Sequence, residues 1–161
     1  MTSADTTYLN NNLKGDSDMD DFITKEDVRK ACKELGITDW SKKKKVSVTI
    51  NEAKKILKRI DTSGMTVSPE NFRIGLEVEL EHGTMFPQYN VTNNHPILSG
   101  MIVMAHFMEM LDYYQRLEVA ELEGDILKAV KKNNMAKVTK YYNRLAKAKA
   151  LLAGSEIKSL K

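Results

Sequence analysis

Histidine and carboxylate side chains gather in one short part of the sequence, where together they could bind a transition metal. All three histidines lie between residues 82 and 106, in a stretch that is also rich in glutamate. His82, His106 and Glu109 would fall on two neighbouring predicted helices, which could direct imidazole and carboxylate ligands into one gap. The Glu-x-x-His order of di-iron helix bundles is not repeated on the second helix, which has His106-x-x-Glu109 instead.

The same part of the sequence is also consistent with a buried hydrogen-bond network that holds no metal. Polar side chains that are buried between helices need hydrogen-bond partners, and histidine, glutamate and tyrosine can satisfy one another. The network predicted on this basis comprises Glu77, Glu81, His82, His106, Glu109, Asp112, Tyr113 and Arg116. The sequence leaves the metal site and the network open as alternatives.

A second cluster of oxygen ligands, Asp16, Asp18 and Asp20, precedes the first predicted helix. Calcium needs several oxygen atoms that converge from alternate positions of a loop, and this spacing resembles that of an EF-hand loop. Asp21 stands where such a loop needs glycine, and Asp27 replaces the glutamate that binds calcium through both oxygens. The sequence therefore predicts either a weakened calcium site or an acidic lead-in to a helix.

Motifs that identify an enzyme are absent from the sequence. The chain has no G-x-x-x-x-G-K-[ST], G-x-G-x-x-G or G-x-S-x-G segment, so the recognisable phosphate-binding, dinucleotide-binding and hydrolase motifs are excluded. Cys32, the single cysteine, falls on the apolar face of a predicted helix and is expected to be an inert core residue. We therefore predict a protein that is not an enzyme and has no cofactor other than the divalent metal considered above.

Charge alternates in blocks along the chain. Counted from the sequence, the net charge is −5 for residues 1–27, +7 for 28–66, −8 for 67–125 and +9 for 126–161. Opposite blocks can pair within one fold or can face neighbours in an assembly. The basic block could contact nucleic acid, for which the candidate residues are Lys131, Lys132, Lys140 and Arg144, or it could form the solvated face of an amphipathic helix.

Composition predicts an all-α protein. The 161 residues include only three prolines and eight glycines, beside 42% hydrophobic and 29% charged residues, which favours long helices over a turn-rich β-sandwich. No apolar run reaches the roughly 18 residues of a membrane span, and the start MTSADTTYLNNN lacks the pattern of a signal peptide. We therefore expect a cytoplasmic protein with no membrane contact.

Capping residues and turns place the first three helices. Thr24 and Asp27 predict a capping box for a helix that ends at Gly36, and a second helix is expected to start near Thr49. The Ser68-Pro69-Glu70 segment predicts the start of a third helix, which is expected to end at Gly83. Residues 61–72 resemble a shortened EF-hand loop, so the first part of the chain is expected to form an EF-hand-like helix-loop-helix pair.

One long central helix is expected to begin at Pro96 and to continue at least to Leu122, with a break at Gly124-Asp125. Two segments, 126–132 and 135–153, are expected to form a helical hairpin. The chain then divides into a polar N-terminal tail (1–22), a helix-loop-helix segment (23–66), a helical core (67–125) and a basic C-terminal hairpin (126–161).

Residues 68–123 carry a run of short motifs, namely V-E-L-E-H-G, N-V-T, H-P and A-H-F-x-E-x-x-D-Y-Y-x-R-L. This run resembles an uncharacterised domain family found in tailed phages, large viruses and bacteria. The matching residues are Glu79, Glu81, His82, Gly83, Asn90, Thr92, Pro96, His106, Glu109, Asp112, Tyr113, Tyr114 and Arg116. His95 departs from the acidic residue that is usual at its position. The resemblance implies a phage or viral context, but no reaction.

Taken together, these features predict a non-catalytic structural or interaction protein, encoded by a phage or virus and present as a minor component of a virion or other assembly. Capsid or other virion proteins and a second copy of the chain are the expected partners. A metal-binding module and a nucleic-acid-binding protein are the alternatives. The expected location is the cytoplasm of the producing cell, or the virion.

Overall fold

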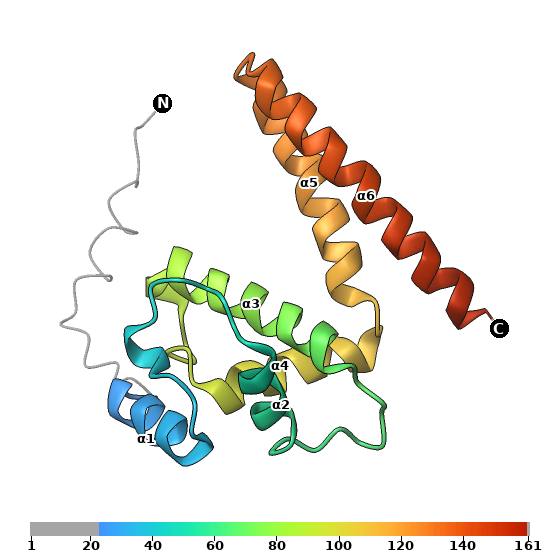
Figure 1. Ribbon diagram of the computed structural model, residues 1–161. Helices are drawn as coiled ribbons and strands as arrows, with labels where there is room; N and C mark the ends of the chain where they lie inside the picture. Colours follow the sequence, from blue (N-terminus) through green and yellow to red (C-terminus); the bar gives the residue numbers. More distant parts are fainter. Residues whose placement is uncertain (1–22, 161) are drawn as a thin grey trace, which may run out of the picture.

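Residues 23–160, which are the residues that the computed structural model describes, form helices and loops with no strand among them (Figure 1). The all-α prediction is therefore confirmed. The elements are α1 (Lys25–Leu35), a 3₁₀ helix η1 (Trp40–Lys42), α2 (Ile50–Leu57), α3 (Pro69–Met85), a 3₁₀ helix η2 (Pro87–Tyr89), α4 (Pro96–Glu109), α5 (Tyr113–Lys131) and α6 (Met135–Ser159).

The predicted helix starts are confirmed at the level of single hydrogen bonds. The Thr24 hydroxyl accepts a hydrogen bond from the Asp27 backbone at 3.2 Å, while the Asp27 carboxylate accepts one from the Thr24 backbone at 2.9 Å. Glycine at position 36, with φ of 62°, ends α1, as expected of a residue that tolerates the left-handed region. Thr49 caps α2, and the Ser68 hydroxyl caps α3.

The prediction that Gly83 ends the third helix is wrong, because α3 continues to Met85. Gly83 is required for a different reason. A Cβ atom at this position would overlap the side chains of Asn94 and Asn90, which lie against the helix backbone. Glycine here permits a close approach of the following loop and does not terminate the helix.

The prediction of one continuous helix from Pro96 to Leu122 is also wrong. The chain bends at residues 110–112, where Met110 is extended with φ of −156° and ψ of 130°, and α5 then continues through Gly124 without a break. In a continuous helix, Phe107 and Tyr114 would be separated by about 10 Å along the axis. With the bend, the centroids of the two rings lie 5.6 Å apart. Packing between the rings therefore takes the place of the backbone hydrogen bonds that a continuous helix would make here.

Two hydrophobic clusters hold the fold together. The larger is formed by α1–α4 with the start of α5, and its fully buried side chains include Trp40, Ile56, Phe72 and Leu76. The smaller lies between α5 and α6, around Leu122, Leu145 and Ala148. We call α1–α4 with the start of α5 the body, and α5 with α6 the hairpin. Each of the two has its own hydrophobic cluster.

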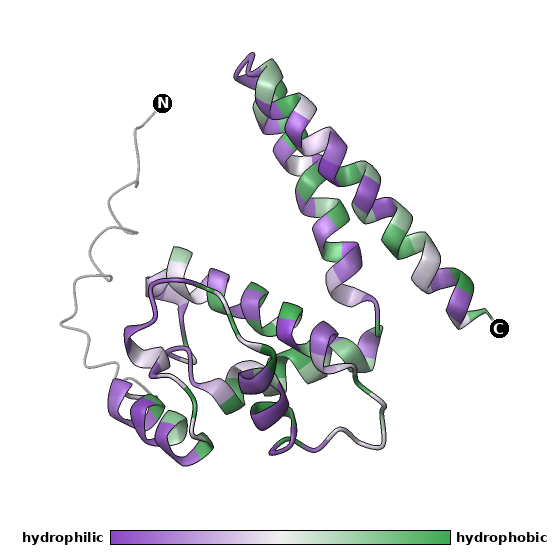
Figure 2. Cartoon of the chain, in the orientation of Figure 1, coloured by the Kyte–Doolittle hydropathy of each residue, from purple (hydrophilic) through white to green (hydrophobic). Residues whose placement is uncertain are grey.

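The α5–α6 hairpin projects from the body (Figure 1). Its turn lies at Asn133, with φ of 50°, and at Asn134, whose side chain caps α6, so the predicted reversal at this point is confirmed. The first arm of the hairpin is the whole of α5 and not residues 126–132, and the predicted boundary between residues 125 and 126 falls inside this helix. Hydrophobic and hydrophilic residues alternate along both arms in Figure 2. No helix among residues 23–160 is long and apolar enough to cross a membrane.

Candidate functional site

Glu79, His106, Tyr113 and Tyr114 meet where α3, α4 and α5 converge. The Tyr114 hydroxyl donates to Glu79 Oε1 at 2.9 Å, and His106 Nε2 lies 3.7 Å from the same oxygen. The Tyr113 ring stacks on His106 with centroids 4.0 Å apart, and it meets the Tyr114 ring edge-on. These contacts join three helices across the bend at residues 110–112.

Burial raises the pKa of Tyr114, and the adjacent Glu79 carboxylate raises it further. The phenol is therefore held in its protonated form and serves as a hydrogen-bond donor to the carboxylate. Gly75 allows this arrangement, since a Cβ atom there would lie 2.7 Å from Tyr114 Cε2 and 2.6 Å from Val103 Cγ1. The contacts of this cluster hold α3, α4 and α5 in fixed positions relative to one another.

The predicted polar network is divided among separate places in the fold. His106 and Tyr113 belong to the cluster just described, whereas Glu77 pairs with Arg73 at 2.6 Å and accepts a hydrogen bond from the Val48 backbone at 2.9 Å. Asp112 pairs with Arg116 at the start of α5.

The other members of the predicted network do not join these contacts. Glu81, His82 and Glu109 are exposed.

Arg116 reaches Glu156 of α6 at 2.8 Å in addition to Asp112, and this contact links the start of α5 to α6 at the base of the hairpin.

The residues predicted to bind a metal are not brought together within the described part of the chain. His82 and Glu109 are exposed, while His106 is half-buried beside Glu79. Among residues 23–160 no group of three or more histidine, cysteine, aspartate or glutamate side chains could hold a metal ion. The predicted calcium ligands Asp16, Asp18 and Asp20 lie outside the described residues.

The loop that resembles a second EF-hand loop runs from the end of α2 to the start of α3. Asp61 Oδ1 accepts a hydrogen bond from the Ser63 backbone at 2.8 Å, and Ser63 and Gly64 both have positive φ. These features describe a tight turn made by the loop itself.

Glu52 is a buried carboxylate that the sequence did not single out. Its side chain accepts hydrogen bonds from the Thr38 hydroxyl at 2.5 Å, the Thr49 backbone at 2.9 Å and the Trp40 indole at 3.3 Å. Burial raises the pKa of Glu52, but these hydrogen bonds outweigh it and hold the pKa at about 2. The T-x-x-E pattern at residues 49–52 could have predicted the capping contact. No local sequence pattern predicts the contacts of Glu52 to residues 38 and 40.

Asn90 and Asn94 form a second buried polar contact that sequence reasoning missed. The Asn90 amide donates to Asn94 Oδ1 at 2.9 Å and to the Gly83 carbonyl at 3.2 Å. This places Asn90 and Gly83, which both belong to the family-like motifs, in one structural contact. Two of the motif residues, Gly83 and Asn90, therefore anchor the loop after α3 to the helix.

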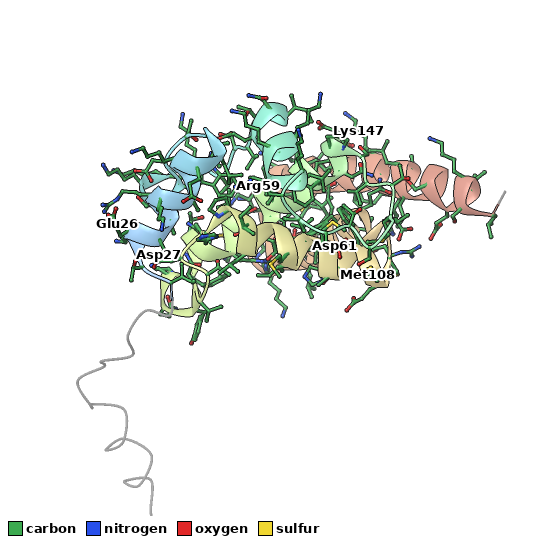
Figure 3. The ribbon with its side chains drawn as sticks, turned by 90° about the horizontal axis from the view of Figure 1, so that it is seen from below. Glu26, Asp27, Arg59, Asp61, Met108 and Lys147 are labelled. Carbon is green, nitrogen blue, oxygen red and sulfur yellow. The ribbon has the colours of Figure 1, made fainter. Side chains whose placement is uncertain are left out.

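Among the hollows of the described residues, one lies on the surface of the body and another at its junction with the hairpin. One, of about 290 Å³, lies between α4 and the loop after α2, and its walls include Arg59, Asp61 and Met108 (Figure 3). The other, of about 630 Å³, lies at the base of the hairpin and is lined in part by Gln115 and Lys158. Gln115 Oε1 is the one buried side-chain oxygen or nitrogen in residues 23–160 without a hydrogen-bond partner.

The residues predicted to contact nucleic acid lie on the hairpin. Lys131 and Lys132 end α5, and Lys140 and Arg144 lie on α6, all of them exposed. Arg144 differs from the three lysines because its guanidinium lies 3.4 Å from the Glu118 carboxylate of α5.

Comparison with protein families gives a match to DUF5661, described as a protein of unknown function, over residues 28–123. The matched segment covers more than half of the chain, and it ends within α5, before the whole of α6. No curated protein and no solved structure matches the chain.

Proposed function

Because the chain belongs to the DUF5661 family, whose members have no known function, we propose a function from the chain's own structure. We propose that it is a non-catalytic helical interaction protein and that the α5–α6 hairpin binds a protein partner. The observation that carries this proposal is a second apolar face on α6, which neither α5 nor the body covers.

The covered face of α6 packs Tyr141, Leu145 and Ala148 against α5. A different set of apolar residues recurs at spacings of three, four and seven, so that its members share another face of the helix. This uncovered face comprises Met135, Tyr142, Ala146, Ala150, Ala153, Ile157 and Leu160. Its larger members Met135, Tyr142 and Ile157 are 66%, 64% and 57% exposed.

A helix with one apolar face needs only one partner, and α5 already fills that role for α6. A second row of exposed apolar side chains is typical of a surface that another protein covers. The alanines at its centre leave room for a second helix to approach closely.

The polar clusters of the body support a non-catalytic role. Glu52 and Glu79 each accept hydrogen bonds from side chains that bind neighbouring elements together. Neither residue lines either of the two hollows described above. The acidic and basic blocks pair in part within the hairpin, where Lys149 lies 2.7 Å from Glu123.

The phage or viral origin and the place in a virion belong to the same proposal. The motif resemblance at residues 68–123 supports them, and a structural protein of an assembly would use an uncovered helix face in this way.

The mass of the assembly tests this proposal. The full chain would be isolated under mild conditions from the cells or particles that produce it, and its mass measured by light scattering after gel filtration. We expect a species much heavier than 18.3 kDa. Tyr142→Gln combined with Ile157→Gln should shift the protein to the mass of the free chain.

Leu151→Gln is the matched control, because Leu151 is 67% exposed on another face of the same helix. The control should leave the assembly intact. A wild-type chain recovered at 18.3 kDa, or equal loss of assembly in the two variants, would overturn the proposal.

A further inference from the structure

The end of α5 and most of α6 carry only positive charge. Residues 126–155 contain no aspartate or glutamate and eight lysine or arginine residues. The segment lies beyond the end of the matched family region at residue 123. Its charge is therefore a property of this chain's hairpin and not of the region matched to the family.

Acidic residues of α5 neutralise three of these eight cations. Lys128 lies 3.1 Å from Asp125, Arg144 lies 3.4 Å from Glu118, and Lys149 lies 2.7 Å from Glu123. The five cations without an ion pair among residues 23–160 are Lys131, Lys132, Lys137, Lys140 and Lys147. All five side chains belong to exposed residues, so they support neither hydrophobic cluster.

Three of these lysines form a row on α6. Lys137, Lys140 and Lys147 follow one another at spacings of three and seven, which places them on one face of the helix. The row extends over ten residues, or about 15 Å of helix. Lys131 and Lys132 lie at the end of α5, beside the turn that joins the two helices.

The basic row and the uncovered apolar face lie on different sides of α6. With 100° of rotation per residue, Lys140 is displaced from Tyr142 by about 160° around the helix axis. A partner that contacts Lys140 therefore leaves the apolar face uncovered, whereas an amphipathic helix on a membrane would insert Tyr142.

We propose that these five lysines of the hairpin bind the phosphate backbone of double-stranded nucleic acid. Ammonium groups bind phosphate as point charges, and contacts to the phosphate backbone carry no sequence information. Binding is therefore independent of sequence and driven by the release of counterions. This site is separate from the apolar face of the proposed function, so either can hold without the other.

Fluorescence anisotropy with the full chain and a labelled 20-base-pair DNA duplex tests the inference. If five phosphates are neutralised, the logarithm of the binding constant should fall with a slope of about −4.5 against the logarithm of salt concentration. A rise from about 50 to about 200 mM salt then weakens binding by about 500-fold.

The triple variant Lys137→Gln, Lys140→Gln and Lys147→Gln should reduce the salt slope by about 2.7, because three phosphate contacts are lost. Glutamine has nearly the helix propensity of lysine, so the hairpin should still form, which circular dichroism checks. The control variant Lys30→Gln, Lys44→Gln and Lys45→Gln removes the same charge from exposed sites on the body and should leave the slope unchanged.

Four results would each overturn the inference. They are no binding to the duplex at about 50 mM salt, binding that salt does not weaken, equal losses in the two triple variants, and binding to phosphatidylserine vesicles with none to the duplex. Tyr142→Gln should leave duplex binding unchanged, which separates failure of this site from failure of the apolar face.

Discussion

A buried carboxylate of the body is held by internal hydrogen bonds, whereas a row of lysines on the hairpin is exposed to solvent. Glu52 is 5% exposed and accepts hydrogen bonds from Thr38, Trp40 and Thr49, which all precede α2. Lys140 on α6 is exposed and has no ion pair among residues 23–160. Glu52 therefore helps to hold the body together, while Lys140 belongs to the row for which we propose a nucleic-acid partner.

The two regions also differ in how much apolar surface they leave uncovered. Trp40 is 1% exposed in the body, whereas Tyr142 is 64% exposed on the hairpin. Two aromatic residues of similar size therefore have different roles. Trp40 holds elements of the same chain together, and Tyr142 lies on the face of α6 for which we propose a protein partner.

Truncation of these two aromatic residues should give the largest contrast. Trp40→Ala should reduce the free energy of unfolding by about 3 to 5 kcal/mol, because it removes a fully buried side chain. Tyr142→Ala should change it by less than about 0.5 kcal/mol. Urea unfolding followed by circular dichroism measures both, and similar losses would contradict the division into body and hairpin.

Glu52→Gln should destabilise the body by about 3 kcal/mol at neutral pH. This figure follows from the pKa of Glu52, which the fold lowers from 4.5 to about 2. A depressed carboxylate pKa contributes stability that is fully present above pH 4.5 and is lost as the pH falls toward 2. The gap between wild type and variant should therefore close over this range. Urea unfolding monitored by Trp40 fluorescence measures the gap, and a gap that is constant with pH would exclude this role.

Glycine-to-alanine substitutions should act with opposite signs in the two regions. Gly75→Ala should cost about 1 to 3 kcal/mol, since the added methyl group overlaps Val103 and Tyr114. Gly124→Ala should stabilise α5 by about 1 kcal/mol, because no atom lies within 4 Å of the new Cβ and alanine favours a helix. Thermal unfolding tests the pair, and a shift of the same sign in both variants would be evidence against it.

Salt should produce the smallest effect. The pairs Arg144 with Glu118 and Lys149 with Glu123 join half-exposed side chains, so each contributes less than about 1 kcal/mol. Glu123→Gln should weaken the hairpin slightly at low salt, and the difference should vanish near 1 M sodium chloride because of screening. Hydrogen exchange at the α5 and α6 amides provides the measurement, with Glu26→Gln on α1 as the control.

The candidate site was only partly predictable from sequence. The sequence singled out His106, Tyr113 and Arg116 for one network, but the structure divides them between two places, and their main partners Glu79, Tyr114 and Glu156 were not part of the predicted network. Those partners come from other helices, and the register between helices depends on how the bend at residues 110–112 is made. No local pattern in the sequence contains that information.

The sequence by itself determined the features that depend on a few adjacent residues. Thr24 with Asp27, the Ser68-Pro69 start and the Asn133-Asn134 turn each act through backbone groups within a few positions, so their effect can be read locally. Only the tertiary structure decided that Gly83 lies within a helix and that the chain bends before Tyr113. At the bend, burial of aromatic rings outweighs local helix propensity. At Gly83, the loop after α3 packs against the helix backbone, which only a residue without a Cβ atom permits.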